Sequence, residues 1–342
     1  MSTTSTNWKL ILSYNGSRFH GWQVQPGFTT VQGVLSEAIE RLTGERVLPQ
    51  GSGRTDAGVH AFAQVATFEL NAPVPAANLQ RALNRILPDS IRVLTAESVP
   101  SSFHARHSAR SKTYEYRIFE RRTRPRPGEA AIERICSPFL SPFVWDCRWP
   151  LDLAPMQEAA ALLIGTRDFT SMAATNPDRA TRDAEDDASD GSPRSAKVNP
   201  VKTIFSSEWS RRLLHAGILA PGTLAPEPLT SAFGPSPADT LLVYRITGSG
   251  FLHHMVRNIV GTLVDIGRGS LNVADLQRIL DARDRTAAGP TAPARGLYLV
   301  EVHYDRADPS NPQSGCPALD AQSPAGQGRS AGPAANPSEA RP

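Results

Sequence analysis

The chain has 342 residues, which suits two ordinary domains or one large domain with a sizeable core. Its composition, 40% hydrophobic and 20% charged, is typical of a soluble globular protein. No apolar run reaches the length of a membrane span, and the N-terminal MSTTSTNWKL lacks the apolar core of a signal peptide, so we expect a cytoplasmic protein. Cys136, Cys147 and Cys316 are an odd count without metal-ligand spacing, and we expect reduced thiols.

Positive charge is concentrated in one stretch, although the net charge is only +3. Residues 106–126 contain seven arginines and Lys112, against Glu115 and Glu120. A basic stretch with interleaved aromatic residues predicts a surface that contacts phosphates. The alternative is a solvated loop, because runs of charge are often simply exposed. The candidate phosphate-contacting residues are Arg106, Arg110, Lys112, Arg121, Arg122 and Arg124.

Apolar residues with a period of two predict strands, and those with a period of three to four predict helices. In chain order, the first half is predicted to contain a strand at 8–14, a helix at 31–42, a strand at 64–70, a helix at 75–86 and strands at 91–98 and 112–119. Thr29 and Gln32 fit a capping box at the start of the first helix.

In chain order, the second half is predicted to contain a helix at 155–164, strands at 201–209 and 241–247, helices at 251–266 and 273–282, and a strand at 297–304. Strands and helices that do not strictly alternate favour an α+β fold with mainly antiparallel strands and flanking helices. Because the second half echoes the first, we expect two sheet-based lobes, residues 7–110 and 111–305, with a cleft between them.

Three segments differ from the rest in composition. Residues 176–199 are acidic and rich in Ser and Ala, and residues 220–239 are rich in Pro, Ala, Ser and Gly. Residues 306–342 are of low complexity, with seven prolines and no apolar periodicity. Because these segments have little to bury, we predict two disordered insertions and a disordered tail.

The most informative stretch is GSGRTDAGVHA at residues 51–61, just before a predicted strand. Its glycines allow backbone conformations closed to other residues and a close approach of a ligand to the main chain. An aspartate held in such a loop beside an arginine suits a reacting centre, so Asp56 and Arg54 are candidate site residues. An isolated G-x-G-R-x-D is equally consistent with a tight hairpin that has a surface ion pair.

The whole loop resembles the catalytic loop of the tRNA pseudouridine synthase A (TruA type) family. Further stretches resemble that family in the same order: FHAR at 103–106, KTYEY at 112–116, FLHHMVRNIVG at 251–261 and APARGLYL at 292–299. The similarity spans residues 7–305 apart from the insertions.

The resemblance implies a pseudouridine-synthase-like fold and an isomerase that converts uridine to pseudouridine at positions 38, 39 and 40 of the tRNA anticodon stem-loop. It also implies a homodimer that binds the anticodon arm. Asp56 matches the catalytic residue, Arg257 its charged partner, and Arg54 the residue that braces the RNA after the target base is extruded.

Two substrate contacts are also implied by the resemblance. Tyr114 matches the active-site tyrosine, and Leu297 matches the apolar residue that packs against the base. Without the resemblance, Tyr116 is an equal candidate, because residues two apart share one face of a strand. Without the resemblance, Leu297 is best interpreted as an ordinary leucine of a core strand.

The implied reaction changes neither oxidation state nor composition, so we expect no cofactor and no metal. A carboxylate in a pocket must stay ionised although desolvation raises carboxyl pKa values, and a nearby guanidinium counters this. On sequence alone, Arg257 is equally consistent with an arginine on a helix surface. His253 and His254 are interpreted as packing or phosphate contacts, because a histidine pair without a third ligand is weak evidence for a metal site.

Two other functions fit part of the pattern. A nucleosidase or glycoside hydrolase also attacks an anomeric carbon, but it usually needs a second carboxylate, and no partner for Asp56 stands out. A non-catalytic RNA-binding module fits the basic stretch, but the intact GRTDAG loop argues against it. Release or retention of the base would separate the first alternative from an isomerase.

Overall fold

The computed structural model describes residues 5–122, 133–174, 199–213 and 240–305, and residues 1–305 belong to one compact unit. The strands are β1 (Thr6–Tyr14), β2 (Gln50–Gly51), β3 (His60–Leu70), β4 (Ile91–Val99), β5 (Ala109–Glu120), β6 (Trp145–Cys147), β7 (Gly165–Asp168), β8 (Val201–Leu213), β9 (Thr240–Gly248) and β10 (Leu297–Tyr304). The α-helices are α1 (Val31–Thr43), α2 (Ala76–Ile86), α3 (Leu153–Ala161), α6 (Met255–Gly267) and α7 (Val273–Ala282).

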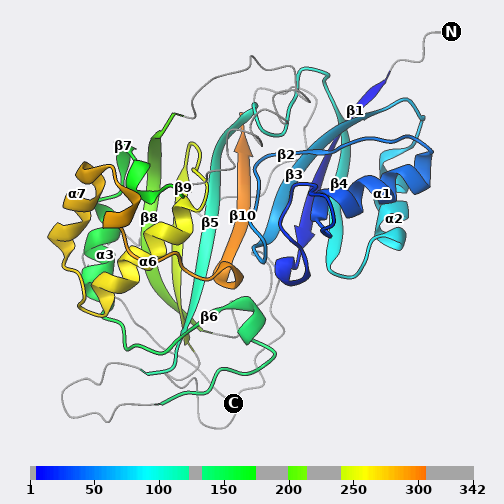
Figure 1. Cartoon of the computed structure of the whole chain (residues 1–342). Coiled ribbons are helices and arrows are strands. Elements are labelled where there is room, and N and C mark those ends of the chain that lie inside the picture. The colour runs from blue at the N-terminus through cyan, green and yellow to red at the C-terminus, as the bar shows by residue number, and fades with distance from the viewer. Residues whose placement is uncertain (1–4, 123–132, 175–198, 214–239, 306–342) are drawn as a thin grey trace, which may run out of the picture. The chain divides into compact units, whose positions relative to one another are not determined.

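These strands form one sheet across the described residues (Figure 1). The strand order is β4-β1-β3-β10-β5-β9-β8-β7, with β2 added to β3 and β6 added to β5. All neighbouring strands are antiparallel except β10 with β3 and β5 with β6. The predicted α+β fold with a mainly antiparallel sheet is therefore confirmed.

The last strand joins the two halves of the chain, because β10 lies between β3 and β5. Leu299 is aligned with Ala61 on one side and with Tyr114 on the other. Helices α1 and α2 lie beside β4, β1 and β3, whereas α3, α6 and α7 lie beside β9, β8 and β7 (Figure 1). The boundary that we expect at residue 110 falls inside β5, and the division into two lobes stays a prediction.

Helix α1 begins one residue later than the capping pattern predicted. Thr30, not Thr29, is the N-cap, and its Oγ1 accepts a hydrogen bond from the Gly33 amide at 3.3 Å. Gln32 is buried, and its side-chain amide donates to the Pro49 carbonyl at 2.9 Å. A buried amide needs tertiary partners, so this glutamine is not available to cap its own helix.

Helix α6 begins at Met255, four residues after the predicted start of the 251–266 helix. The preceding residue, His254, has the left-handed backbone angles φ 58° and ψ 2°. Phe251 and Leu252 continue the apolar pattern of the helix, but they belong to the turn before it. Periodicity of apolar residues reports burial, not backbone angles, so it places the helix start too early.

The two predicted insertions, apart from Asn199, and the predicted tail lie outside the described residues. Among the residues that the structure does describe, no helix has the length and apolar character that crossing a membrane requires.

Candidate active site

The loop at residues 52–59 connects β2 to β3, and a neighbouring segment presses against its backbone. Gly21 has a φ of 88°, and a Cβ there would lie 2.6 Å from the Thr55 carbonyl oxygen. A Cβ on Gly16 would lie 1.9 Å from the Val59 carbonyl oxygen. Only glycine fits at both positions, so the shape of the loop depends on this close approach of two backbones.

Buried side chains of the neighbouring strands β1 and β3 form hydrogen bonds with the same loop. The Tyr14 hydroxyl and Thr55 Oγ1 share a hydrogen bond of 2.8 Å, and Gln64 Nε2 donates to the Gly53 carbonyl at 2.8 Å. Burial raises the pKa of Tyr14 to about 12, so its hydroxyl stays protonated at neutral pH. Both contacts hold the part of the loop that directly precedes Asp56.

Asp56 lies against Arg257, which belongs to the first turn of α6. Arg257 Nη1 donates to Asp56 Oδ2 at 2.9 Å, and Arg257 Nε donates to the Ala292 carbonyl at 2.8 Å. The Asp56 and Arg257 side chains are 19% and 15% exposed, so the pair is shielded yet reachable from solvent. The guanidinium is therefore held at two points beside the carboxylate.

The Ala292 carbonyl is itself placed by a close contact between its segment and α6. A Cβ on Gly261 would lie 1.7 Å from the Pro290 carbonyl oxygen, so this helix position accepts only glycine without a shift of the backbone. The Ala292 amide returns a hydrogen bond to the Arg257 carbonyl at 3.1 Å. The APARGLYL stretch therefore positions the guanidinium as well as supplying β10.

Two histidines face the same carboxylate. His253 Nε2 lies 3.6 Å from Asp56 Oδ1, and His254 Nε2 lies 3.4 Å from Asp56 Oδ2. Burial lowers the pKa of His254, and the charges of His253 and Arg257 add to the shift, against the opposing effect of Asp56. Backbone strain of the kind seen at His254 is found most often at functional sites. The sequence interpretation as packing or phosphate contacts missed this proximity, for which the HHMVRN stretch contains no local signal.

The structure distinguishes the two candidate tyrosines on β5. The Tyr116 hydroxyl donates to the Pro293 carbonyl at 2.6 Å, and its side chain is fully buried. The Tyr114 hydroxyl makes no hydrogen bond to another described residue, and its ring packs edge-on against Phe251 with centroids 5.0 Å apart. Burial, with the nearby charges of Tyr14 and Asp56, raises the pKa of Tyr114. Of the two tyrosines, Tyr114 is the one whose hydroxyl has no hydrogen-bond partner among the described residues and whose pKa is affected by the charge of Asp56.

The other two predicted contacts lie at different depths. Leu297 is 5% exposed and is aligned with Tyr116 across the β10–β5 pair. Arg54 is exposed and lies two residues before Asp56 in the same loop.

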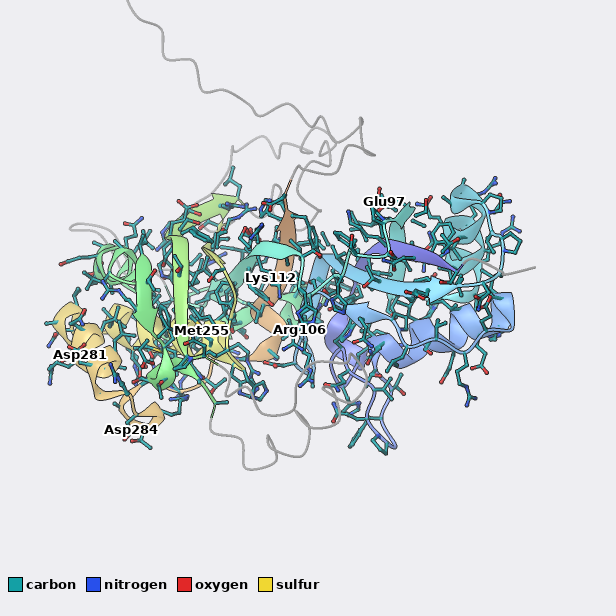
Figure 2. All side chains as sticks on the ribbon, turned by 90° about the horizontal axis from the view of Figure 1, so that it is seen from above. Glu97, Arg106, Lys112, Met255, Asp281 and Asp284 are labelled. Carbon is teal, nitrogen blue, oxygen red and sulfur yellow. The ribbon has the colours of Figure 1, made fainter. Side chains whose placement is uncertain are left out.

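Three cations gather beside the loop. Lys112 Nζ donates to the Ser52 carbonyl, which ties β5 to the residue next to Gly53. Burial lowers the pKa of Lys112 to about 8, and the charges of Arg106 and Lys202 contribute. Figure 2 labels Arg106 and Lys112 near the middle of the sheet. Lys202, on β8, was not among the predicted residues, because its sequence neighbours show no basic pattern.

The rest of the basic stretch is largely paired with carboxylates. Arg121 makes two hydrogen bonds to Asp146, at 2.8 and 2.7 Å, Arg122 lies 3.3 Å from Glu133, and Arg110 donates to Asp305 at 2.6 Å. Arg117 is buried beside Glu115. Arg124 lies outside the described residues. Along β5, the unneutralised positive charge is therefore concentrated at the Lys112 end.

Comparison with known proteins gives one consistent result. The family model described as "tRNA pseudouridine synthase" matches residues 10–108 and 159–305. A protein of Solibacter usitatus named tRNA pseudouridine synthase A is 44% identical over 296 residues, which cover 86% of this chain and 98% of that protein. Two further proteins of the same name are also similar to this chain. The protein from Moorella thermoacetica is 38% identical, covering 86% of this chain and 98% of that protein. The protein from Thermoanaerobacter sp. is 35% identical, covering 87% of this chain and 99% of that protein.

Proposed function

Because the chain belongs to the tRNA pseudouridine synthase family, we propose that it isomerises uridine to pseudouridine at positions 38, 39 and 40 of the tRNA anticodon stem-loop. The observation that supports this most directly is the contact between Asp56 and Arg257, 2.9 Å long and partly open to solvent, beside the available hydroxyl of Tyr114.

The reaction breaks the bond from the ribose C1′ to N1 of uracil and forms a bond from C1′ to C5. The C5 proton is released, and N1 gains a proton. Asp56 is the carboxylate at this junction and acts as nucleophile or general base. Arg257 is the charged partner of that carboxylate, because a guanidinium beside a carboxylate offsets the cost of desolvating the negative charge.

The uracil must leave its stack before it reaches Asp56. Arg54, exposed on the same loop, braces the RNA where the base has left. The Tyr114 ring stacks on the uracil, and its high pKa keeps the hydroxyl protonated as a donor in proton transfer. Leu297, which is buried on β10, is the apolar residue that packs against the base.

The proposed partner is the anticodon arm of tRNA, bound by a cytoplasmic homodimer. Arg106 and Lys112 contact backbone phosphates beside the target base, because their charges lie next to the catalytic loop. Arg110, Arg121, Arg122 and Arg124 remain predicted contacts. Arg110, Arg121 and Arg122 are each paired with a carboxylate, so RNA phosphates would have to compete with these partners.

A nucleosidase or glycoside hydrolase is less well supported. Such enzymes usually place a second carboxylate across the scissile bond. Among the described residues, the groups paired with the Asp56 carboxylate are Arg257, His253 and His254, and no partner carboxylate stands out in the sequence.

The test is incubation of the full chain with tRNA labelled with tritium at uracil C5. We expect tritium release, pseudouridine at positions 38–40, and no free uracil. Release of free uracil would show that the enzyme is a nucleosidase and not an isomerase. Tight tRNA binding without tritium release would leave a non-catalytic RNA-binding module.

A further inference from the structure

The residues around Asp56 have the spacing of metal ligands. One ligand atom from each of Asp56, His253 and His254 lies within 4.8 Å of the other two. The carboxylate–imidazole distances, 3.4 and 3.6 Å, exceed the 2.7–3.2 Å of ordinary N–H···O hydrogen bonds. Two ligands of one tetrahedral Zn²⁺, each about 2.0–2.1 Å from the metal, lie about 3.3–3.4 Å apart. The two carboxylate–imidazole distances, which end on different oxygens of Asp56, are close to this second value.

The donor set also matches zinc. Two imidazole nitrogens and one carboxylate oxygen are the three protein ligands of many zinc centres, with water in the fourth position. The side chains of His253, His254 and Asp56 are 45%, 28% and 19% exposed, so an ion from solvent can reach them. The third ligand that the histidine pair lacks in the sequence is Asp56, which the fold supplies.

Arg257 sets the strength of such a site. Its guanidinium occupies Asp56 Oδ2 at 2.9 Å, so a cation bound by the same carboxylate meets a fixed positive charge. This opposition suits reversible binding rather than a permanently bound metal. Zinc bound here would also neutralise the carboxylate that the proposed reaction needs.

We propose that Asp56, His253 and His254 form an inhibitory site for Zn²⁺, at which the metal and the tRNA uridine exclude one another. The inhibition rests on the proposed function, because Asp56 is the catalytic carboxylate of that function. The binding of zinc does not depend on it. Mg²⁺ does not replace Zn²⁺, since it prefers oxygen ligands in a nearly ideal octahedron.

Binding is tested with the metals alone and no RNA. Zn²⁺ is titrated calorimetrically into the full chain, and Co²⁺ is used to record the visible spectrum of the site. We expect one site per chain, for which Zn²⁺ and Co²⁺ compete. The cobalt spectrum should be that of a tetrahedral site without a thiolate band. Loss of second-shell partners alone weakens metal sites about 10–100-fold, so His253→Ala and His254→Ala should each weaken Zn²⁺ binding at least about tenfold.

Two further variants sharpen the binding test. His303→Gln is the matched control, because His303 is 46% exposed and lies 3.3 Å from Glu301 but belongs to no three-ligand group among the described residues. It should bind Zn²⁺ like wild type. Arg257→Gln should bind Zn²⁺ more tightly, because it removes the opposing charge. Zinc binding that is unchanged in both alanine variants would overturn the proposal.

Inhibition is tested by tritium release with Zn²⁺ or Mg²⁺ present, each variant being compared with its own metal-free rate. We expect inhibition by Zn²⁺ alone, relieved by added tRNA, with the half-inhibitory concentration at least about tenfold higher in His253→Ala and His254→Ala. Full activity with Zn²⁺ bound at the site would overturn the inhibitory role. No tritium release from the metal-free wild type, with zinc binding intact, would overturn the proposed function and not the site.

Discussion

Strand β5 has a carboxylate–arginine pair near each of its faces, and the two pairs differ in their exposure to solvent. On the Tyr114 face, Asp56 meets Arg257 at 2.9 Å; on the other face, Glu115 meets Arg117 at 2.8 Å. The contact distances are nearly equal. The difference lies in what surrounds each carboxylate.

The Glu115 pair is closed. Its side chains are only 4% and 6% exposed, and the second carboxylate oxygen accepts from Arg212 at 3.3 Å. The Arg117 guanidinium lies 4.3 Å from the Tyr298 ring centroid and 5.1 Å from that of Phe62. With its carboxylate and guanidinium both engaged, this pair has no group left for a substrate.

The Asp56 pair is open. Arg257 occupies one carboxylate oxygen, while the imidazoles lie beyond hydrogen-bond distance and the site stays partly exposed. We therefore expect the closed pair to act on stability and the open pair to act in the reaction. Four experiments test this contrast.

The largest effect is expected for Asp56→Asn. It should reduce turnover below about 1% of wild type, because general acid–base groups contribute roughly 10²–10⁴-fold. Its tRNA affinity should stay within a few-fold, since phosphate contacts supply most of the binding. Tritium release and filter binding measure the two quantities. Turnover above about 1% would be too high for an essential carboxylate.

Glu115→Gln should act on stability instead. It leaves the Arg117 charge buried without its carboxylate, which costs about 3–5 kcal/mol of unfolding free energy. Urea unfolding measures this loss, and tritium release by the folded protein should be unchanged.

The control for that variant replaces both partners, Glu115→Leu with Arg117→Met. Apolar residues of similar volume often substitute for a buried pair at no net cost, so this protein should recover much of the loss. A cost below about 1 kcal/mol for Glu115→Gln alone would mean that the pair is not a stabilising element.

His60, which lies near the closed Glu115–Arg117 pair, should make the stability of the fold sensitive to acid. It is buried, its Nδ1 accepts from the Gly16 amide at 3.1 Å, and it stacks on Tyr298. Burial lowers the pKa of His60 from 6.5 to about 4. The unfolded chain therefore binds the proton more readily, and stability falls as the pH drops from about 6.5 to about 4.

Between pH 7 and pH 5 this linkage amounts to about 2 kcal/mol. Urea unfolding at both pH values gives the change in unfolding free energy between pH 7 and pH 5. This change should be smaller in His60→Asn than in wild type. His303→Gln, an exposed histidine, should leave the wild-type pH dependence intact. Equal pH dependences for wild type and His60→Asn would contradict the prediction.

The smallest effect is expected for Arg257→Ala, about tenfold in turnover on the acid side of the pH–rate profile, where a shift of one pH unit changes the reactive fraction tenfold. Without the guanidinium the carboxylate ionises less readily, so the acid limb of the pH–rate profile should move upward by at least about one pH unit. Arg257→Lys should recover part of the activity, because it keeps the charge but loses the fork that reaches both Asp56 and the Ala292 carbonyl. An unmoved acid limb would exclude Arg257 as the partner of Asp56.

Much of this molecule follows from the sequence alone. The α+β class and the main strands come from apolar patterns that repeat over two to four residues, and the Asp56 loop comes from one contiguous motif, residues 51–61. Both kinds of signal depend only on neighbours along the chain. The same-face relation of Tyr114 and Tyr116 is also local, since side chains alternate along a strand. Resemblance to a family added roles to these positions.

Tertiary structure decided the contacts that make the site. Asp56 and Arg257 are 201 positions apart, and they meet because β10 lies between β3 and β5 and brings Ala292 against α6. Only the fold showed that the Tyr116 hydroxyl is occupied and Tyr114's is not. It also divided the basic stretch, because Arg110, Arg121 and Arg122 meet carboxylates from other parts of the chain, whereas Lys112 meets the Ser52 carbonyl. Local patterns specify elements; long-range packing specifies which charges face each other, and the chemistry depends on those charges.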